Sequence, residues 1–449
     1  MKRIQRVLFT GLFLLPVISA HSQNGINSPY SRYGFGVMSD RSLGFNKGMS
    51  GVAQGFRDGQ IVNVANPASY SAVDSLTALI DLGLTLQNGN FKIGNVQHNA
   101  RNTSLDYAAF HFRATKNVGV AVGILPYTNI NYNMNSASEQ VAGNENITSS
   151  YSFKGEGGLH QAFIGAGWRI TPPLSVGING SFLFGDYLHI NTMSFNDQSA
   201  YSLIRGYSAN ISTWMLDAGF QFTQPLKTGD RLVLGFTYGL GHDVNNRSIR
   251  YTETYNPSTA VSEGYSADTL KNAFQLPHTF SVGVTYYKGT QWQVGADFEL
   301  QKWSDCKFPA QDGVGQYTAT KGQLNDKMRI AVGCSYVPNS KGSRLTNRIA
   351  YKFGGFYSKS YVNADQSLLK TDKPYEYGLS AGVSIPISNR NVWYNIPKLN
   401  FSVQWVHSNI PYVSAMSATP TISKLTENYL RFSIGMTFSE RWFFKHRME

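Results

Sequence analysis

Residues Gly44–Asp74 read GFNKGMSGVAQGFRDGQIVNVANPASYSAVD and differ in character from the chain that follows them. This stretch is rich in small residues and in glycine, which permits a compact path with close backbone contacts. It ends in Asn66-Pro67-Ala68. Asn is a favoured helix N-cap and Pro is best tolerated at the first helical position, so the sequence predicts a short helix that begins at Asn66.

From Leu76 to Phe438 the sequence alternates apolar and polar residues in one segment after another. The final segment, Tyr429–Phe438, sets an apolar face against a small and polar one, with Leu430, Phe432, Ile434, Met436 and Phe438 opposite Arg431, Ser433, Gly435 and Thr437. A period of two residues is the signature of a β-strand. We count 14 such segments. The sequence therefore predicts an all-β fold, a 14-stranded antiparallel transmembrane β-barrel, with Gly44–Asp74 as part of a short N-terminal plug.

The first 22 residues have the pattern of a secretory signal peptide. Lys2, Arg3 and Arg6 form a basic start, a short apolar run follows, and Ala20-His21-Ser22 offers a cleavage site of small residues. We therefore expect residues 1–22 to be removed on export and the protein to reside in the bacterial outer membrane.

The composition supports a membrane barrel over a soluble protein. Aromatic residues make up 13% of the chain and charged residues only 15%, where a soluble protein of this length carries about 25%. After the leader, no run approaches the roughly 18 apolar residues that a spanning helix needs. The formal net charge of +12 favours anionic partners such as lipid headgroups, with solvated loops as the alternative. No basic–aromatic interleave typical of nucleic-acid binding is present.

Loop lengths alternate along the predicted barrel. Short turns such as Thr115-Lys116-Asn117 and Lys288-Gly289-Thr290 separate hairpins whose other ends carry long loops, including 191–208 and 242–275. Short turns on one side and long loops on the other are expected of bacterial outer-membrane barrels. The even strand count then places both termini in the periplasm. We predict a lead-in and plug over residues 23–75, the barrel over 76–438 and a periplasmic tail over 439–449.

The residues GMSGVAQGFRD followed by NPA resemble the N-terminal hatch of the FadL-type family of long-chain fatty-acid transporters. The matching positions are Gly48, Gly51, Asp58, Asn66, Pro67 and Ala68. The resemblance covers the hatch by motif and the remainder by strand count alone. It implies a 14-stranded barrel with a plug, in which Gly51, Asp58, Asn66, Pro67 and Ala68 gate the lumen or contact a ligand. For Gly51 a purely structural role is the stronger alternative.

The third predicted strand is interrupted by proline, in GVAVGILPYTNINYN. A proline cannot donate to the hydrogen-bond ladder, so Pro126 marks a bulge, an edge or a kink. The FadL-type resemblance implies an inward kink in the third strand that opens the wall sideways, here at Gly123 and Pro126. The alternative is that the strand simply ends at Leu125.

No constellation of catalytic or metal-binding residues stands out. The histidines lack metal-ligand spacing. Gly378–Gly382 matches G-x-S-x-G, but it lies within a predicted strand instead of a strand–turn–helix elbow, which places Ser380 on the lumen side. We expect no enzyme activity, no cofactor and no metal. Cys306 and Cys334 are the only cysteines, and the sequence leaves open whether they form a disulfide.

Two functions remain open from the sequence. The first is a FadL-like conduit for hydrophobic or amphipathic small molecules, with a plug and a lateral opening through which apolar solutes gain by entering lipid directly. The alternative is a non-transporting barrel, similar to the PorV type, that serves as a subunit of an envelope secretion or outer-membrane protein assembly complex. In that case the loops and the aromatic tail are docking surfaces for other envelope proteins.

Overall fold

The computed structural model describes residues 28–441, apart from 94–95, 137, 142–143, 227–228, 245, 312–315, 364–373, 388–395 and 415–420. The predicted leader (1–22) and the end of the predicted tail (442–449) lie outside the described residues. Among the described helices, none has the length and apolar character required to cross a membrane.

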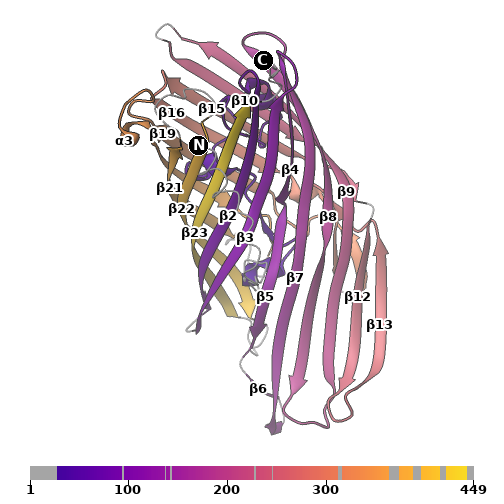
Figure 1. Cartoon of the computed structure of the whole chain (residues 1–449). Coiled ribbons are helices and arrows are strands. Elements are labelled where there is room, and N and C mark those ends of the chain that lie inside the picture. The colour runs from indigo at the N-terminus through magenta and orange to yellow at the C-terminus, as the bar shows by residue number, and fades with distance from the viewer. Residues whose placement is uncertain are drawn as a thin grey trace, which may run out of the picture.

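A closed barrel of 14 antiparallel strands forms the wall, as the sequence predicts. The barrel closes between its first and last strands, whose pairing runs from Thr77↔Arg441 to Ile93↔Leu425. Figure 1 shows these two strands, β2 and β23, side by side. The wall consists of β2 (Thr77–Ile93), β3 (Val96–Arg113), β4 (Val118–Pro126), β7 (Asn144–Arg169), β8 (Leu174–Phe195), β9 (Ser202–Pro225), β10 (Arg231–Gly239), β15 (Thr279–Lys288), β16 (Trp292–Gln301), β19 (Lys327–Tyr336), β20 (Ala350–Lys359), β21 (Tyr375–Pro386), β22 (Lys398–Ser414) and β23 (Thr421–Arg441).

The apolar face of each wall strand points outward. In β2, Ile80 and Leu84 are 43% and 48% exposed, whereas Asp81 between them is fully buried in the lumen. A soluble barrel has the opposite arrangement, with apolar residues inside. The outward apolar band is that of a barrel that faces lipid.

The last wall strand runs past the predicted barrel boundary at Phe438. Ser439, Glu440 and Arg441 continue the ladder of β23 against Leu79, Ala78 and Thr77. The strand extends because β2 begins at Thr77 and offers partners to the end. Residues 439–441, predicted as the start of the tail, therefore belong to the wall.

The third wall strand is broken. β4 ends at Pro126, β5 (Thr128–Asn135) follows after Tyr127, and β6 (Glu139–Val141) continues the same path. β3 pairs with β4 only from Ala108↔Ile124 to Arg113↔Gly119, and β5 pairs with β7 but not with β3. The free edge of β5 pairs instead with a two-residue strand of the N-terminal segment, β1 (Val37–Met38). We call this interruption of the wall the break.

A long hairpin between β9 and β15 lies outside the barrel circuit, β12 (Arg247–Asn256) with β13 (Val261–Lys271). β12 pairs with the first part of β9, residues 202–210, and β13 pairs with β12. We call residues 202–210 of β9 together with β12 and β13 the side sheet; Figure 1 shows β12 and β13 beside the long lower parts of β8 and β9. The remaining short strands are β11 (Asp243–Val244), β14 (Phe274–Gln275), β17 (Phe308–Gln311) and β18 (Tyr317–Thr320).

The N-terminal segment runs through the lumen. It contains the 3₁₀ helix η2 (Pro29–Arg32), the one-turn helix α2 (Gly44–Lys47) and the 3₁₀ helix η3 (Pro67–Ala72). Two further short helices, η4 (Trp303–Asp305) and α3 (Leu345–Arg348), lie in connections between wall strands. The segment 28–75 is the plug of this barrel.

Candidate functional site

The end of the plug is the helix that the sequence predicts at Asn66. Asn66 caps η3, since its side-chain oxygen accepts a hydrogen bond from the N–H of Ala68 at 3.1 Å. Its amide nitrogen donates to the carbonyl of Gln54 at 2.9 Å, which ties the helix to the rest of the plug. The carbonyl of Ala68 accepts from Arg57 at 3.1 Å. Asn66, Pro67 and Ala68 thus form one buried unit of the plug, and their role in gating or ligand contact stays a prediction.

Glycines on the lumen side of the wall bring its backbone against the plug backbone. A Cβ atom on Gly235 would lie 1.9 Å from the carbonyl oxygen of Gln54, and one on Gly177 would lie 2.3 Å from the carbonyl carbon of Pro67. Only glycine fits at these distances. A similar approach to the plug backbone recurs around the barrel, at Gly119, Gly167, Gly333, Gly354, Gly382 and Gly435. We call these positions the glycine contacts.

Gly51 and Asp58 lie in different parts of the plug. Gly51 has a φ of +79°, which favours glycine, and it lies beside Asp40 and Arg329. Asp58 accepts a hydrogen bond from the N–H of Gln60 at 2.8 Å and so stabilises a turn. The structure therefore does not bring the two residues into one constellation, and their role in gating stays a prediction.

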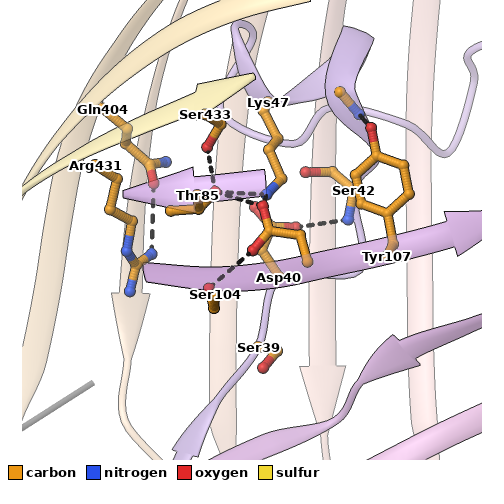
Figure 2. A network of polar contacts seen from close by, with 12 residues as sticks. Ser39, Asp40, Ser42, Lys47, Thr85, Ser104, Tyr107, Gln404, Arg431 and Ser433 are labelled. Carbon is orange, nitrogen blue, oxygen red and sulfur yellow. Dashed lines mark hydrogen bonds and ion pairs between the residues drawn. The ribbon is translucent and has the colours of Figure 1, made fainter. Parts of the chain in front are cut away.

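Ion pairs connect the plug to the wall in the middle of the lumen. Arg41 pairs with Asp217 of β9 at 2.6 Å, where the Asp217 side chain is only 8% exposed. Lys47 pairs with Asp106 of β3. Figure 2 shows Lys47 reaching from the plug towards Thr85 of β2, whose hydroxyl lies 2.6 Å from that of Ser433.

A third ion pair joins a plug carboxylate to an arginine of the wall. Asp40 lies 3.8 Å from Arg329 of β19, and Arg329 also donates to the carbonyl of Ser50 at 2.7 Å. Burial raises the pKa of the Asp40 carboxyl, but Arg329 and the N–H of Ser42 more than offset it, so that this pKa lies below its ordinary value. Asp40 is therefore charged at neutral pH and pairs with Arg329. We call Asp40, Arg41, Lys47, Asp106, Asp217 and Arg329 the charge network.

Further wall side chains bind the plug backbone. Asp297 of β16 accepts hydrogen bonds from the N–H groups of Ala53 and Gln54 at 2.6 and 2.9 Å. Ser380 of β21, which the sequence places on the lumen side, receives the N–H of Ser50 at 2.8 Å. Lys352 is fully buried and donates to the carbonyl of Phe45 at 3.0 Å. These three side chains hold the plug backbone against the wall.

An aromatic cluster covers the plug at its other end. Phe35 is 1% exposed, and its ring lies 5.1 Å from that of Phe274, 5.6 Å from Trp303 and 5.4 Å from Phe308. These partners come from connections between wall strands, outside the barrel circuit itself. Ring pairs at such distances contribute beyond the apolar area they bury. We call these four residues the aromatic cap.

A cavity of about 360 Å³ lies beside the break. Leu125 and Pro126 of β4 line one side, and Lys47, Asp106 and Arg431 line another. Pro126 is thus the last residue of β4 and borders this cavity, whereas Gly123 lies within the strand opposite Ala109 of β3. The lateral opening at these two residues stays a prediction. A cavity of about 500 Å³ around Asp58 and Gln60 shares no lining residue with the first.

Sequence reasoning missed the charge network and most of the contacts that fix the plug. Lys47 and Arg57 lie in the plug stretch, and aspartates recur on the polar side of the strands, but their pairing depends on how the plug is threaded. Glu299 of β16 lies directly opposite Arg329 of β19 in the strand register. Arg329 nevertheless donates a hydrogen bond to the carbonyl of Ser50 in the plug. Cys306 and Cys334 are both free.

Comparison with solved structures shows the fold. A Pseudomonas aeruginosa FadL homologue superposes with a TM-score of 0.61 at 11% identity, over 90% of this chain and 99% of that one. The P. putida toluene transporter TodX gives 0.59 at 12%, over 91% and 100%. The Ralstonia pickettii toluene transporter TbuX gives 0.55 at 14%, over 89% and 98%. The FadL-type barrel that the hatch motif suggested is therefore the fold of this chain.

Sequence comparison identifies the family of the chain. A comparison with curated proteins gave no match. The family model described as BamG matches residues 3–449, which is nearly the whole sequence. The chain therefore belongs to the BamG family and has the FadL-type fold.

Proposed function

We propose that this protein is a FadL-type outer-membrane barrel with a permanently closed lumen, and that it acts as a subunit of an outer-membrane protein assembly complex. The observation that carries the proposal is the ring of glycine contacts, at which wall and plug backbones meet without intervening side chains. A plug that moves must break these contacts together with the partly buried charge network. The BamG family match is compatible with a subunit role.

Energetics favour a static plug. Separating one partner of a buried ion pair costs roughly 3–5 kcal/mol, and the plug holds several pairs with the wall. A path for an apolar solute along this lumen would cross the charge network, where displacing the polar partners of buried charges is costly. The lumen is therefore suited to hold the plug, and the surfaces that remain for function are outside it.

A conduit for hydrophobic or amphipathic molecules is the second candidate, and the break favours it. The cavity there has a volume of about 360 Å³, which lies within the range of small-molecule sites. Ile124 and Leu125 give it an apolar side next to the place where β3 and β5 do not pair. An amphipathic ligand could place its apolar part there and its polar part on Arg431.

Locking the plug to the wall distinguishes the two functions. The hydroxyls of Ser50 and Ser380 lie 2.8 Å apart, so Ser50→Cys with Ser380→Cys forms a plug–wall disulfide on oxidation, in a background of Cys306→Ala and Cys334→Ala. We expect the locked protein to sustain normal levels of other outer-membrane barrels. The two single-cysteine variants and the reduced double variant are the controls. Loss of function on oxidation, restored by reductant, would show that the plug must move and would favour the conduit.

A further inference from the structure

The side sheet has an open edge. Along β9, residues 217–225 pair with β10 within the barrel, while residues 202–210 pair with β12. β13 pairs with β12 on one side and, among the described residues, with no strand on the other. A strand edge presents a row of unpaired N–H and C=O groups, which is a template for another strand.

This edge lies beyond the lipid-facing band. Exposed Phe220 and Trp214 belong to the apolar band of β9. The segment of strand from Phe220 to Asn210 rises about 33 Å along its axis. At a tilt of about 40° this rise spans the whole apolar band, which is about 25 Å tall. The side sheet therefore stands in the aqueous phase.

Apolar side chains are nevertheless exposed there. Tyr265 of β13 is 67% exposed and Val261 is 53% exposed, more than most lipid-facing residues of the wall. Tyr251 of β12 lies against Tyr265 with ring centroids 6.0 Å apart. Exposed aromatic groups beside an unpaired strand edge are typical of a protein interaction surface.

Two carboxylates flank Tyr265, whereas the basic residues Arg247, Arg250 and Lys271 lie towards the other end of the hairpin, where Arg250 is opposite Asp268. Glu253 lies directly opposite Tyr265, and Glu263 lies near it, where Glu263 accepts hydrogen bonds from Tyr201 and Asn256 at 2.8 Å each. Two carboxylates beside exposed aromatic rings complement a segment that carries basic and aromatic residues. Charged side chains and proline on an edge strand prevent it from pairing with another strand. Between Gly264 and Thr269 the edge has one charged residue, Asp268, and no proline, so this part of the edge is suited to accept a strand.

A second copy of this chain does not fit the edge. Two barrels that stand the same way up in one membrane have β13 strands that run in the same direction. A twofold axis along the membrane normal would relate two such barrels. If their edges paired, the outer face of one side sheet would continue as the inner face of the other. Antiparallel pairing of the two edges would require one barrel to be inverted. We therefore take a different chain as the occupant.

We propose that the edge of β13 from Gly264 to Thr269 is a docking strand, to which an extended basic and aromatic segment of another envelope protein adds as a further β-strand. This proposal rests on the proposed subunit role and names the surface that performs it. Main-chain hydrogen bonds supply affinity, and Tyr265 with Glu253 and Glu263 selects the side chains of the partner.

The test measures amide hydrogen exchange in the complex purified from the native membrane and in the isolated barrel. We expect amides of residues 264–269 to exchange at least about tenfold more slowly in the complex, because strand addition protects the edge. Ala267→Lys places a charge on the edge and should remove both the protection and the partner. Thr259→Lys adds the same charge in the exposed turn before β13 and is the matched control.

The outcomes separate this inference from the proposed function. An intact complex in which residues 264–269 exchange as fast as in the isolated barrel would overturn the docking strand alone. An intact complex with Ala267→Lys would do the same. A barrel that purifies without any partner would overturn the subunit role, and the docking strand with it.

Discussion

The contacts between wall and plug differ between two regions of the wall, β19 to β21 and β3 to β5. In the first region, Gly333, Gly354 and Gly382 bring the wall against the plug backbone between Gly48 and Ser50, and a cavity of about 500 Å³ lies beyond these contacts, at the ends of the same strands. In the second, the wall is broken after Pro126 and a cavity of about 360 Å³ separates it from the plug. The difference teaches that closure and opening are local properties of this barrel, set by glycine in one region and by proline in the other.

The largest expected effect comes from the aromatic cap, which closes the lumen away from the glycine contacts. Phe35→Ala removes a fully buried ring from contact with Phe274, Trp303 and Phe308. We expect a loss of about 3–5 kcal/mol in the free energy of unfolding, measured by denaturant titration in lipid vesicles. Phe353→Ala is the control, because Phe353 faces lipid and is 60% exposed. Equal losses for the two variants would contradict a packed cap.

The charge network should show the next largest effect. Arg41→Met leaves Asp217 without its partner, and we expect a loss of about 3 kcal/mol, the lower end for a buried pair because Arg41 is 25% exposed. Lys154→Met breaks an ion pair with Glu156 whose side chains are more than half exposed, and should cost less than about 1 kcal/mol. The same unfolding titration checks both. A similar small cost for Arg41→Met would mean that the network does not hold the plug.

The glycine contacts predict a smaller but position-dependent cost. Gly235→Ala places a Cβ atom 1.9 Å from the carbonyl oxygen of Gln54, and we expect a loss of about 1–3 kcal/mol from overpacking. Gly180→Ala, in the same wall, meets only the carbonyl oxygen of Ile164, at 4.0 Å. It should be neutral or stabilise by up to about 1 kcal/mol. A gain in stability with Gly235→Ala would show that wall and plug are not in contact there.

The break should be the most tolerant region. Pro126→Val restores an N–H at the end of β4, next to a cavity that accepts a small rearrangement, so the free energy of unfolding should change by less than about 1 kcal/mol. The proposed subunit role predicts normal recovery of the complex. A selective loss of uptake of one hydrophobic solute, with the complex intact, would assign the break to transport.

Much of the fold follows from local sequence patterns. Period-two alternation identified every wall strand because each strand has one apolar and one polar face, and Asn66-Pro67 identified η3 because capping depends on adjacent residues. The end of β23 at Arg441 was missed, since it depends on where β2 begins. The lumen-facing glycines are visible in the sequence. Their role could not be predicted, because it depends on the path of the plug through the barrel.

The contacts that decide function are non-local and could not be predicted. Arg41 meets Asp217 and Asp40 meets Arg329 across long separations in the chain, so no spacing rule connects them. The open edge of β13 likewise depends on the choice of β9 as partner for β12. The hatch motif pointed to the correct fold, yet its residues Asn66, Pro67 and Ala68 form one buried unit of the plug and reveal nothing of a ligand.

The central claim is that the lumen is closed and that the protein acts through partners. Gentle detergent extraction from the native membrane, followed by native mass spectrometry, tests it most directly. We predict a stoichiometric complex with other outer-membrane proteins and no small molecule bound in the barrel. A lone barrel that carries a hydrophobic molecule would contradict the claim and would identify the break as the route of a transported ligand.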